Sequence, residues 1–166
     1  MHLKPILRGI RDRLLRGYVR GVIGQELPPL MQAYLREHLP RHYSVYGDEG
    51  RLEIAATAVV NNTLFNLSSG RVWVDDYAFF GHNVCILTGT HDYHRFDEDR
   101  QSAVPTTGRD IVIKRGAWIA SNATVLGPCI VGEHSVVAAC ALVCQDVPPY
   151  AIVAGNPASV VGTVLE

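Results

Sequence analysis

The 166-residue chain lacks the features that mark several large functional classes. Its formal net charge is −1, so it has no broad positive field of the kind that attracts nucleic acid. No apolar run approaches the roughly 18–20 residues that cross a bilayer, and the start, Met1-His-Leu-Lys-Pro5, is not the apolar stretch of a signal peptide. We therefore expect a cytoplasmic protein that does not bind nucleic acid.

The cysteines also lack a functional spacing. Cys85, Cys129, Cys140 and Cys144 form no C-x-x-C pair, which argues against a redox motif or a zinc site of that type. Reduced thiols that pack within the fold are the simplest interpretation. A chain of this length is long enough to bury one core and too short to favour two.

What the sequence does have is a large aliphatic or aromatic residue at every sixth position along most of its length. A helix repeats every 3.6 residues and a strand every 2, so a sustained period of six indicates a solenoid. Each repeat of a solenoid buries its apolar face against its neighbours. The positions are Ile54, Val60, Val74, Phe80, Ile86, Ile113, Ile119, Val125, Val131, Val137 and Val143.

A second set of small residues accompanies the first, four positions later. Its members are Ala58, Ala78, Ala117, Ala123, Cys129, Ser135 and Ala141. Six extended residues at about 3.3 Å each make one short face with its turn, and three faces close a triangular coil. The repeats group as 54–66, 74–86, 113–125 and 131–143, with Asn66 in place of an aliphatic residue and an insertion at 67–71.

The first 45 residues follow another pattern, with apolar residues at helical spacing from Leu3 to Ile23 and arginines on the opposite face. We expect an amphipathic helical segment over 1–45 and the solenoid domain over 46–166. Such a helix can cap the open end of the solenoid or pack on a partner subunit. It can also lie on an anionic membrane surface, which would place the protein at the inner face of the membrane.

The longest interruption of the repeat, at about 88–110, is the place where we expect the chemistry. Long segments without a repeat in a compact fold are more often functional than idle. His91 and His94 lie three residues apart within it. From the residues alone, these histidines can be a general base, metal ligands or neither.

The hexads resemble those of the hexapeptide-repeat acyltransferases. They read Val74-Asp-Asp-Tyr-Ala78, Ile119-Ala-Ser-Asn-Ala123 and Val131-Gly-Glu-His-Ser135, and the phrase Asp146-Val-Pro-Pro-Tyr-Ala-Ile-Val-Ala-Gly-Asn-Pro-Ala158 is similar to the tail of the maltose and galactoside O-acetyltransferase branch. The resemblance runs from about Ile54 to Val161. It implies a mainly β fold, a left-handed parallel β-helix, and a homotrimer with grooves between adjacent chains.

The resemblance also implies a reaction, the transfer of an acetyl group from acetyl-CoA to a hydroxyl of a sugar or saccharide-like acceptor. His91 matches the family's general base, and the backbone amide of Ser121 matches its oxyanion donor. No metal is required. For the acceptor, Asn61 matches a family asparagine, and Ser69 stands where the family has an aspartate. Trp118 and His94 are further acceptor-side candidates.

The donor side departs from the family pattern. The backbone at Ala139 matches the position that binds the pantetheine arm. The family's basic residues for the CoA phosphates are replaced here by Gln145, Ser159 and Gly162. Lys114 and Arg115, which open the third coil, are the candidate substitutes.

Two alternatives from other classes remain. The missing basic residues would suit a non-catalytic scaffold or binding subunit, or a protein with a different donor. A metal enzyme of the γ carbonic anhydrase type would need three histidines around zinc, and His82, His91, His94 and His134 are available. Their spacing does not match the H-x4-H pair of that family.

Overall fold

The structure is a computed structural model that describes residues 42–165, together with Gly17 and Gly21. Almost all of the segment expected to be helical, 1–45, lies outside these residues. The first described strand, β1 (Ser44–Tyr46), pairs in parallel with β3 and so already belongs to the solenoid.

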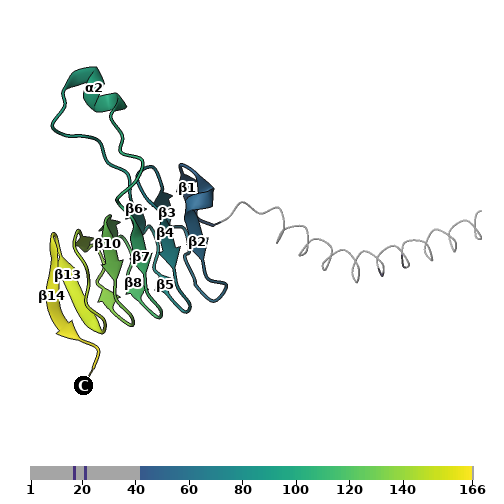
Figure 1. Cartoon of the computed structure of the whole chain (residues 1–166). Coiled ribbons are helices and arrows are strands. Elements are labelled where there is room, and N and C mark those ends of the chain that lie inside the picture. The colour runs from purple at the N-terminus through teal and green to yellow at the C-terminus, as the bar shows by residue number, and fades with distance from the viewer. Residues whose placement is uncertain (1–16, 18–20, 22–41, 166) are drawn as a thin grey trace, which may run out of the picture. The chain divides into compact units, whose positions relative to one another are not determined.

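Three sheets surround a common core within the described residues (Figure 1). The first sheet contains β1, β3 (Leu64–Asn66), β6 (Cys85–Leu87), β9 (Thr124–Leu126) and β12 (Leu142–Val143). The second contains β2 (Leu52–Ile54), β4 (Val72–Val74), β7 (Ile111–Ile113) and β10 (Cys129–Val131). The third contains β5 (Phe79–Phe80), β8 (Trp118–Ile119), β11 (Val136–Val137), β13 (Ala151–Gly155) and β14 (Ala158–Thr163).

The chain visits the second, third and first sheets in turn, and each coil stacks in parallel on the one before. The antiparallel hairpin of β13 and β14 ends the stack. The mainly β, parallel coil predicted from the repeat is therefore confirmed. Its left hand remains an expectation from the family resemblance.

The aliphatic positions of the repeat form the core. Ile86, Ile113, Ile119, Val125, Val131 and Val137 are fully buried, and Ile54 packs against them from a partly exposed position. The small residues two positions before the aliphatic ones are buried as well, from Ala78 at 0% exposure to Cys129 at 2%, except Ala58, which is partly buried. A small residue and the aliphatic residue two positions after it face the same side of the strand, toward the core. The small residue lies nearer the corner, where a larger side chain would not fit.

The corners also explain the residues that precede the small positions. Positive φ occurs at Tyr77, Gly116, Asn122, His134 and Cys140, which precede small positions, and at Asn83 and Tyr150, which precede Val84 and Ala151. The left-handed conformation costs a side chain with a Cβ roughly 1–2 kcal/mol, and asparagine and glycine tolerate it best. The repeat therefore specifies its own turns as well as its core.

We name the three corners for use below. The loop corner joins the first sheet to the second, the charged corner joins the second to the third, and the asparagine corner joins the third to the first. At the loop corner the segment 88–110 extends away from the coil, and it contains the short helix α2 (Asp97–Ser102) (Figure 1). The helical turn η1 (Glu49–Arg51) precedes β2.

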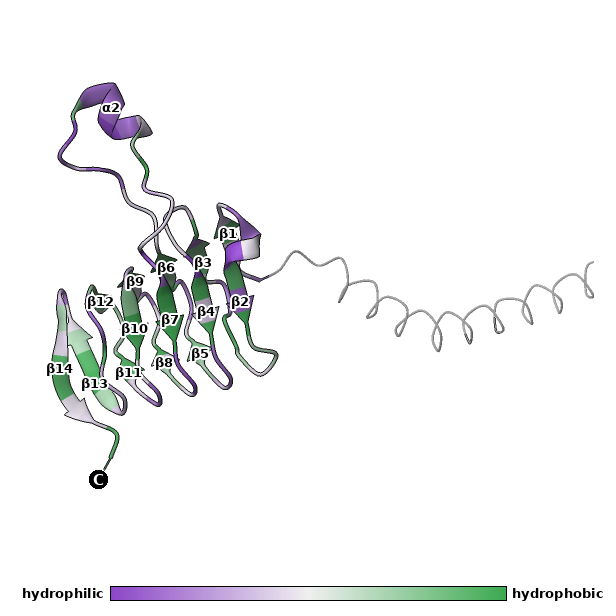
Figure 2. Cartoon of the chain, in the orientation of Figure 1, coloured by the Kyte–Doolittle hydropathy of each residue, from purple (hydrophilic) through white to green (hydrophobic). Residues whose placement is uncertain are grey.

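Hydropathy follows the same division. The strands are mostly apolar, whereas α2 is strongly hydrophilic (Figure 2). Among the described residues, the helices are too short or too polar to span a bilayer.

Candidate active site

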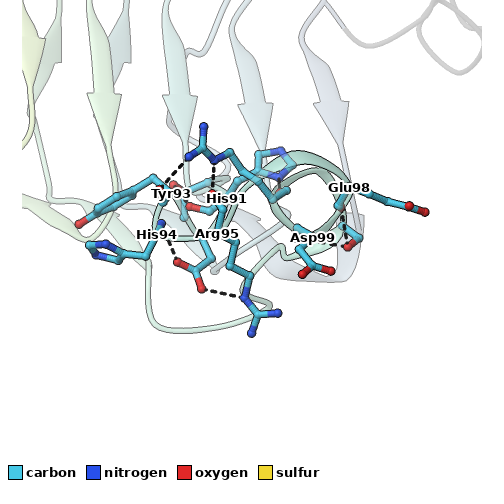
Figure 3. Close-up of polar contacts among 10 residues, drawn as sticks. His91, Tyr93, His94, Arg95, Glu98 and Asp99 are labelled. Carbon is cyan, nitrogen blue, oxygen red and sulfur yellow. Dashed lines mark hydrogen bonds and ion pairs between the residues drawn. The ribbon is translucent and has the colours of Figure 1, made fainter.

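His91 lies at the start of the long loop, and one hydrogen bond fixes its ring (Figure 3). The distance from Nδ1 to the carbonyl oxygen of Arg100 is 2.9 Å. A carbonyl can only accept, so Nδ1 carries the proton, and the lone pair of the neutral ring is on Nε2. Because the residue is exposed, Nε2 is available to take a proton from a substrate hydroxyl.

The residues after His91 form a tight turn around Asp92. One carboxylate oxygen accepts from the His94 amide at 3.1 Å, and the other accepts from Arg95 Nε at 3.1 Å. The hydrogen bond from the His94 amide, and then the one from Arg95, lower the pKa of Asp92. His94 itself is exposed, and its ring lies 4.3 Å from that of Tyr93.

Ser121 lies at the asparagine corner, directly after β8. Its hydroxyl accepts from the His82 amide at 3.1 Å, and its carbonyl accepts from the Cys140 amide at 3.1 Å. Within the described part of the chain its own amide has no acceptor. Gly81 passes so close that an added Cβ would lie 2.5 Å from Ser121 N, and the glycine therefore leaves this amide uncovered.

Two further candidates lie at the same corner. Asn61 is partly buried and donates from Nδ2 to the carbonyl oxygen of Phe80 at 2.6 Å, so its Oδ1 is the atom left for an acceptor. Ala139 is exposed, one residue before the left-handed Cys140. The corner is reinforced by a ladder in which Asn62 donates to Asn83 Oδ1 at 2.6 Å.

Ser69, Gln145 and Trp118 lie elsewhere. Ser69 is completely buried at the base of the loop, and its hydroxyl has no partner, so it presents no surface to an acceptor in this structure. Gln145 is exposed at the loop corner, and its carbonyl accepts from the thiol of Cys129 at 3.3 Å. Trp118 is on the outer face of the third sheet, 43% exposed, and stacks on Phe79 with 5.6 Å between ring centroids.

The two candidate phosphate ligands are at the charged corner and already have partners. Lys114 Nζ is 3.6 Å from Asp75, and Arg115 is 3.9 Å from Asp76 and stacks over Tyr77 at 4.7 Å. These ion pairs are half exposed, so each contributes at most about 1 kcal/mol and could be exchanged for a phosphate. Beyond Arg115 the sequence contains no lysine or arginine.

The structure thus distributes the predicted residues over three corners. Asn61, Ser121 and Ala139 share the asparagine corner, His91, His94, Ser69 and Gln145 belong to the loop corner, and Lys114 and Arg115 belong to the charged corner. The predicted base and the predicted oxyanion donor therefore lie at different corners of one chain.

Three groups that shape the candidate site were not predicted from the sequence: the Arg100 carbonyl, Gly81 and Asp92. The Arg100 carbonyl that orients His91 is nine residues away, and a backbone atom leaves no sequence signal. Gly81 is one of 15 glycines, and only the coil geometry shows what it faces. Asp92 could have been found, because an aspartate two residues before a turn amide is a common turn signal.

The described residues of a single chain form no metal-binding group. No group of three or more His, Cys, Asp and Glu side chains is placed there to hold one ion. The histidines available for the γ carbonic anhydrase alternative therefore form no ligand set within the described residues of one chain.

Comparison with known proteins identifies the repeat. Residues 110–145 match the family model described as bacterial transferase hexapeptide (six repeats). These residues carry the hexapeptide repeat described for bacterial transferases. The resemblance predicted from the hexads is therefore confirmed, and the coils 113–125 and 131–143 both lie within the matched region.

A relative of the hexapeptide-repeat chain is the Saccharomyces cerevisiae protein named "Putative acetyltransferase YJL218W". The two are 30% identical over 129 residues, which is 76% of this chain and 62% of the relative. This chain thus spans less than two thirds of the relative's length.

Solved structures show the same fold. The hexapeptide-repeat acetyltransferase VCA0836 of Vibrio cholerae, complexed with acetyl coenzyme A, is 23% identical with a TM-score of 0.53 over 90% of this chain and 85% of its own. A maltose O-acetyltransferase from Clostridium difficile 630 is 21% identical with a TM-score of 0.52 over 76% of this chain and 68% of its own.

Proposed function

We propose that this protein is a CoA-dependent O-acetyltransferase that acts on a hydroxyl of a sugar or saccharide-like acceptor. The observation that carries the proposal is the fixed tautomer of His91, because its Nδ1 bond to Arg100 leaves Nε2 exposed as a base. The hexapeptide-repeat match and the acetyltransferase relatives support the reaction class. The maltose O-acetyltransferase among the structural neighbours supports a sugar acceptor.

The residues suit each step of acyl transfer. His91 Nε2 takes the proton of the acceptor hydroxyl as its oxygen attacks the thioester carbonyl. The negative charge that develops on the carbonyl oxygen is stabilised by the Ser121 amide. When the intermediate collapses, the C–S bond breaks, the CoA thiolate leaves with the proton held by His91, and an O-acetyl ester remains.

The site is proposed to form between copies of the chain in a homotrimer with the left-handed coils of the family. One chain separates His91 and Ser121 on two corners, and a neighbouring copy could bring the loop corner of one chain to the asparagine corner of the next. Asn61 and, on the face beside it, Trp118 would then face the acceptor, and the loop of the other chain would contribute His94. Ala139 and Gln145 would line the donor groove.

We propose that the phosphates of CoA bind Lys114 or Arg115, which would then release their present partners Asp75 and Asp76. Lys114 borders a groove of about 450 Å³. The other residues that line it are Ile130, Gly132, Glu133, Asp146, Val147, Pro148 and Pro149. Two carboxylates in this groove oppose phosphate, so we expect weaker CoA binding than a cluster of cations would give.

The test is release of free CoA from acetyl-CoA with a panel of acceptors. Hydroxyl sugars and the matching amino sugars are compared, and calorimetry measures acetyl-CoA binding separately. Turnover with hydroxyl acceptors supports the proposal, whereas turnover with amines alone would change the acceptor class. Absence of both binding and turnover would favour the non-catalytic scaffold, for which the lack of cations after Arg115 is the specific observation.

The proposed location is cytoplasmic. Peripheral contact with a membrane through the basic N-terminal segment is a separate prediction, and that segment lies outside the described residues.

A further inference from the structure

The two ends of the long loop meet on the insertion of the preceding coil. Thr88 donates from its hydroxyl to the carbonyl oxygen of Asn66 at 2.8 Å and accepts from the Ser69 amide at 3.1 Å. At the other end the Arg109 amide donates to the Ser69 carbonyl at 3.2 Å. The loop base is therefore bound to residues 66–69, which we call the loop seat.

Arg109 joins the two ends to each other. Its Nε donates to the carbonyl oxygen of Thr88 at 2.8 Å. Its backbone runs between two glycines, since a Cβ added to Gly70 would lie 2.5 Å from Arg109 C and one added to Gly127 would meet Arg109 O. Such close backbone contact on both sides fixes the position at which the loop returns to the coil.

Arg51 holds the returning arm of the loop from a different coil. Its guanidinium donates to the carbonyl oxygen of Thr106 at 2.6 Å and to that of Leu67 at 3.4 Å. Residues 51 and 106 are 55 positions apart, so η1, the loop seat and the loop are connected by a single side chain. Arg51 is partly buried. Its bond to Leu67 is partly shielded from water, whereas its shorter bond to Thr106 is exposed.

These contacts hold the base of the loop that carries His91. The loop is attached to the coil at residues 88 and 109, and Arg51 adds a third attachment at Thr106. The ring of His91 is then oriented by Arg100, which is six residues before Thr106. Since displacement by about 1 Å can cost 10²-fold in rate, the attachment of the loop can control catalysis without touching substrate.

We propose that Arg51 and Arg109 are positioning residues that set the pose of the loop carrying His91. The kinetic part of this inference rests on the proposed function of His91, whereas the structural part does not. The two arginines act through backbone carbonyls, so the loop sequence between residues 92 and 105 can vary without loss of the attachment.

The test compares Arg51→Met with Arg71→Met in the full-length chain. Arg71 is an arginine of the same region, and its side chain pairs with Glu53 at 3.8 Å and not with the returning arm of the loop in the described structure. Hydrogen–deuterium exchange of peptides covering residues 88–110 reports the loop pose, and kcat and KM report catalysis. We expect faster exchange in the loop and a fall in kcat of about 10–100-fold with little change in KM for Arg51→Met, and neither change for Arg71→Met.

The conservative change Arg51→Lys retains one cationic donor toward Thr106 and should recover most of the kcat, even if Arg51→Met folds poorly. Unchanged loop exchange in both Arg51 variants would overturn the attachment. Faster exchange with unchanged kcat would overturn the positioning role. If the wild-type protein shows no transfer at all, the proposed function fails, and the exchange measurement still decides whether Arg51 holds the loop.

Discussion

At the scale of single residues, the two loop histidines differ in their contacts, although the sequence presents them as a pair. His91 is tied to Arg100 through Nδ1, whereas the ring of His94 rests against Tyr93. An imidazole with one nitrogen held by a carbonyl has one defined basic atom. The family resemblance favoured His91, and the hydrogen bond supplies an independent physical reason.

His94→Ala is expected to retain most activity. The loss of its ring leaves the bond from its backbone amide to Asp92 in place, so the loop turn should persist. The fall in kcat should stay far below the roughly 10²–10⁴-fold that removal of a general base causes. A fall of that larger size in steady-state assays would make His94 a catalytic residue.

Ser69 permits a test of the acceptor role predicted from the sequence. Its hydroxyl is buried without a partner, and such a group costs about 1–3 kcal/mol. Ser69→Ala should therefore leave the free energy of unfolding unchanged or raise it, and the KM for the acceptor should not move. Thr88→Val is the matched variant, which should lower the stability because it leaves the Ser69 amide unpaired. A large rise in acceptor KM for Ser69→Ala would restore the acceptor role.

Because of Cys129, the free energy of unfolding should depend on pH in the alkaline range. Burial, and then the nearby Asp146, raise the pKa of this thiol from 9.0 to about 12. The unfolded chain ionises near pH 9 and the folded chain does not, so this contribution to stability is complete below pH 9 and is lost as the pH rises toward 12. Denaturant unfolding between pH 8 and pH 11 should show a shallower decline for Cys129→Ala than for the wild type. Equal slopes would contradict this account.

At the scale of elements, the coils could be predicted because each position of the six-residue repeat has a fixed structural role. Aliphatic residues fill the core, small ones fill the corners, and residues such as Asn83 and Asn122 adopt the left-handed turn. Asn66 was recognised as a break in this pattern, and the structure explains it, since its side chain and carbonyl bind Ser68 and Thr88. The contact with Thr88 joins residues 22 positions apart, so no local pattern could predict it.

Gly81→Ala tests whether the uncovered amide of Ser121 matters. The new Cβ would lie 2.5 Å from Ser121 N, so the coil must shift or the amide must be covered. We expect kcat to fall by about 10²–10³-fold, as for loss of an oxyanion donor, while circular dichroism and oligomeric state are retained. An unchanged kcat would remove Ser121 from the mechanism.

At the scale of the whole molecule, the sequence located the loop and its histidine but not the separation of the site over three corners. The corner at which a residue lies depends on its position within the six-residue repeat. The insertion 67–71 and the loop 88–110 interrupt that repeat. The described residues of one chain place His91 after β6 and Ser121 after β8, on different corners. We therefore predict that a complete site in the proposed enzyme needs a second copy.

Mixed assemblies test this sharing directly. His91→Ala and Gly81→Ala chains are each expected to be inactive alone. In randomly mixed trimers, about a quarter of the interfaces would pair an intact His91 with an intact Ser121 corner. Recovery of roughly that fraction of wild-type activity after joint refolding supports a shared site, and no recovery would place the whole site within one chain.

The most direct measurement of the central claim is kcat of the His91→Ala protein for acetyl transfer from acetyl-CoA, alongside the wild type and with oligomeric state verified. We predict a fall of about 10²–10⁴-fold with the coil intact, because the acceptor hydroxyl loses the base assigned to it. Turnover close to that of the wild type would contradict the mechanism and with it the role assigned to the long loop.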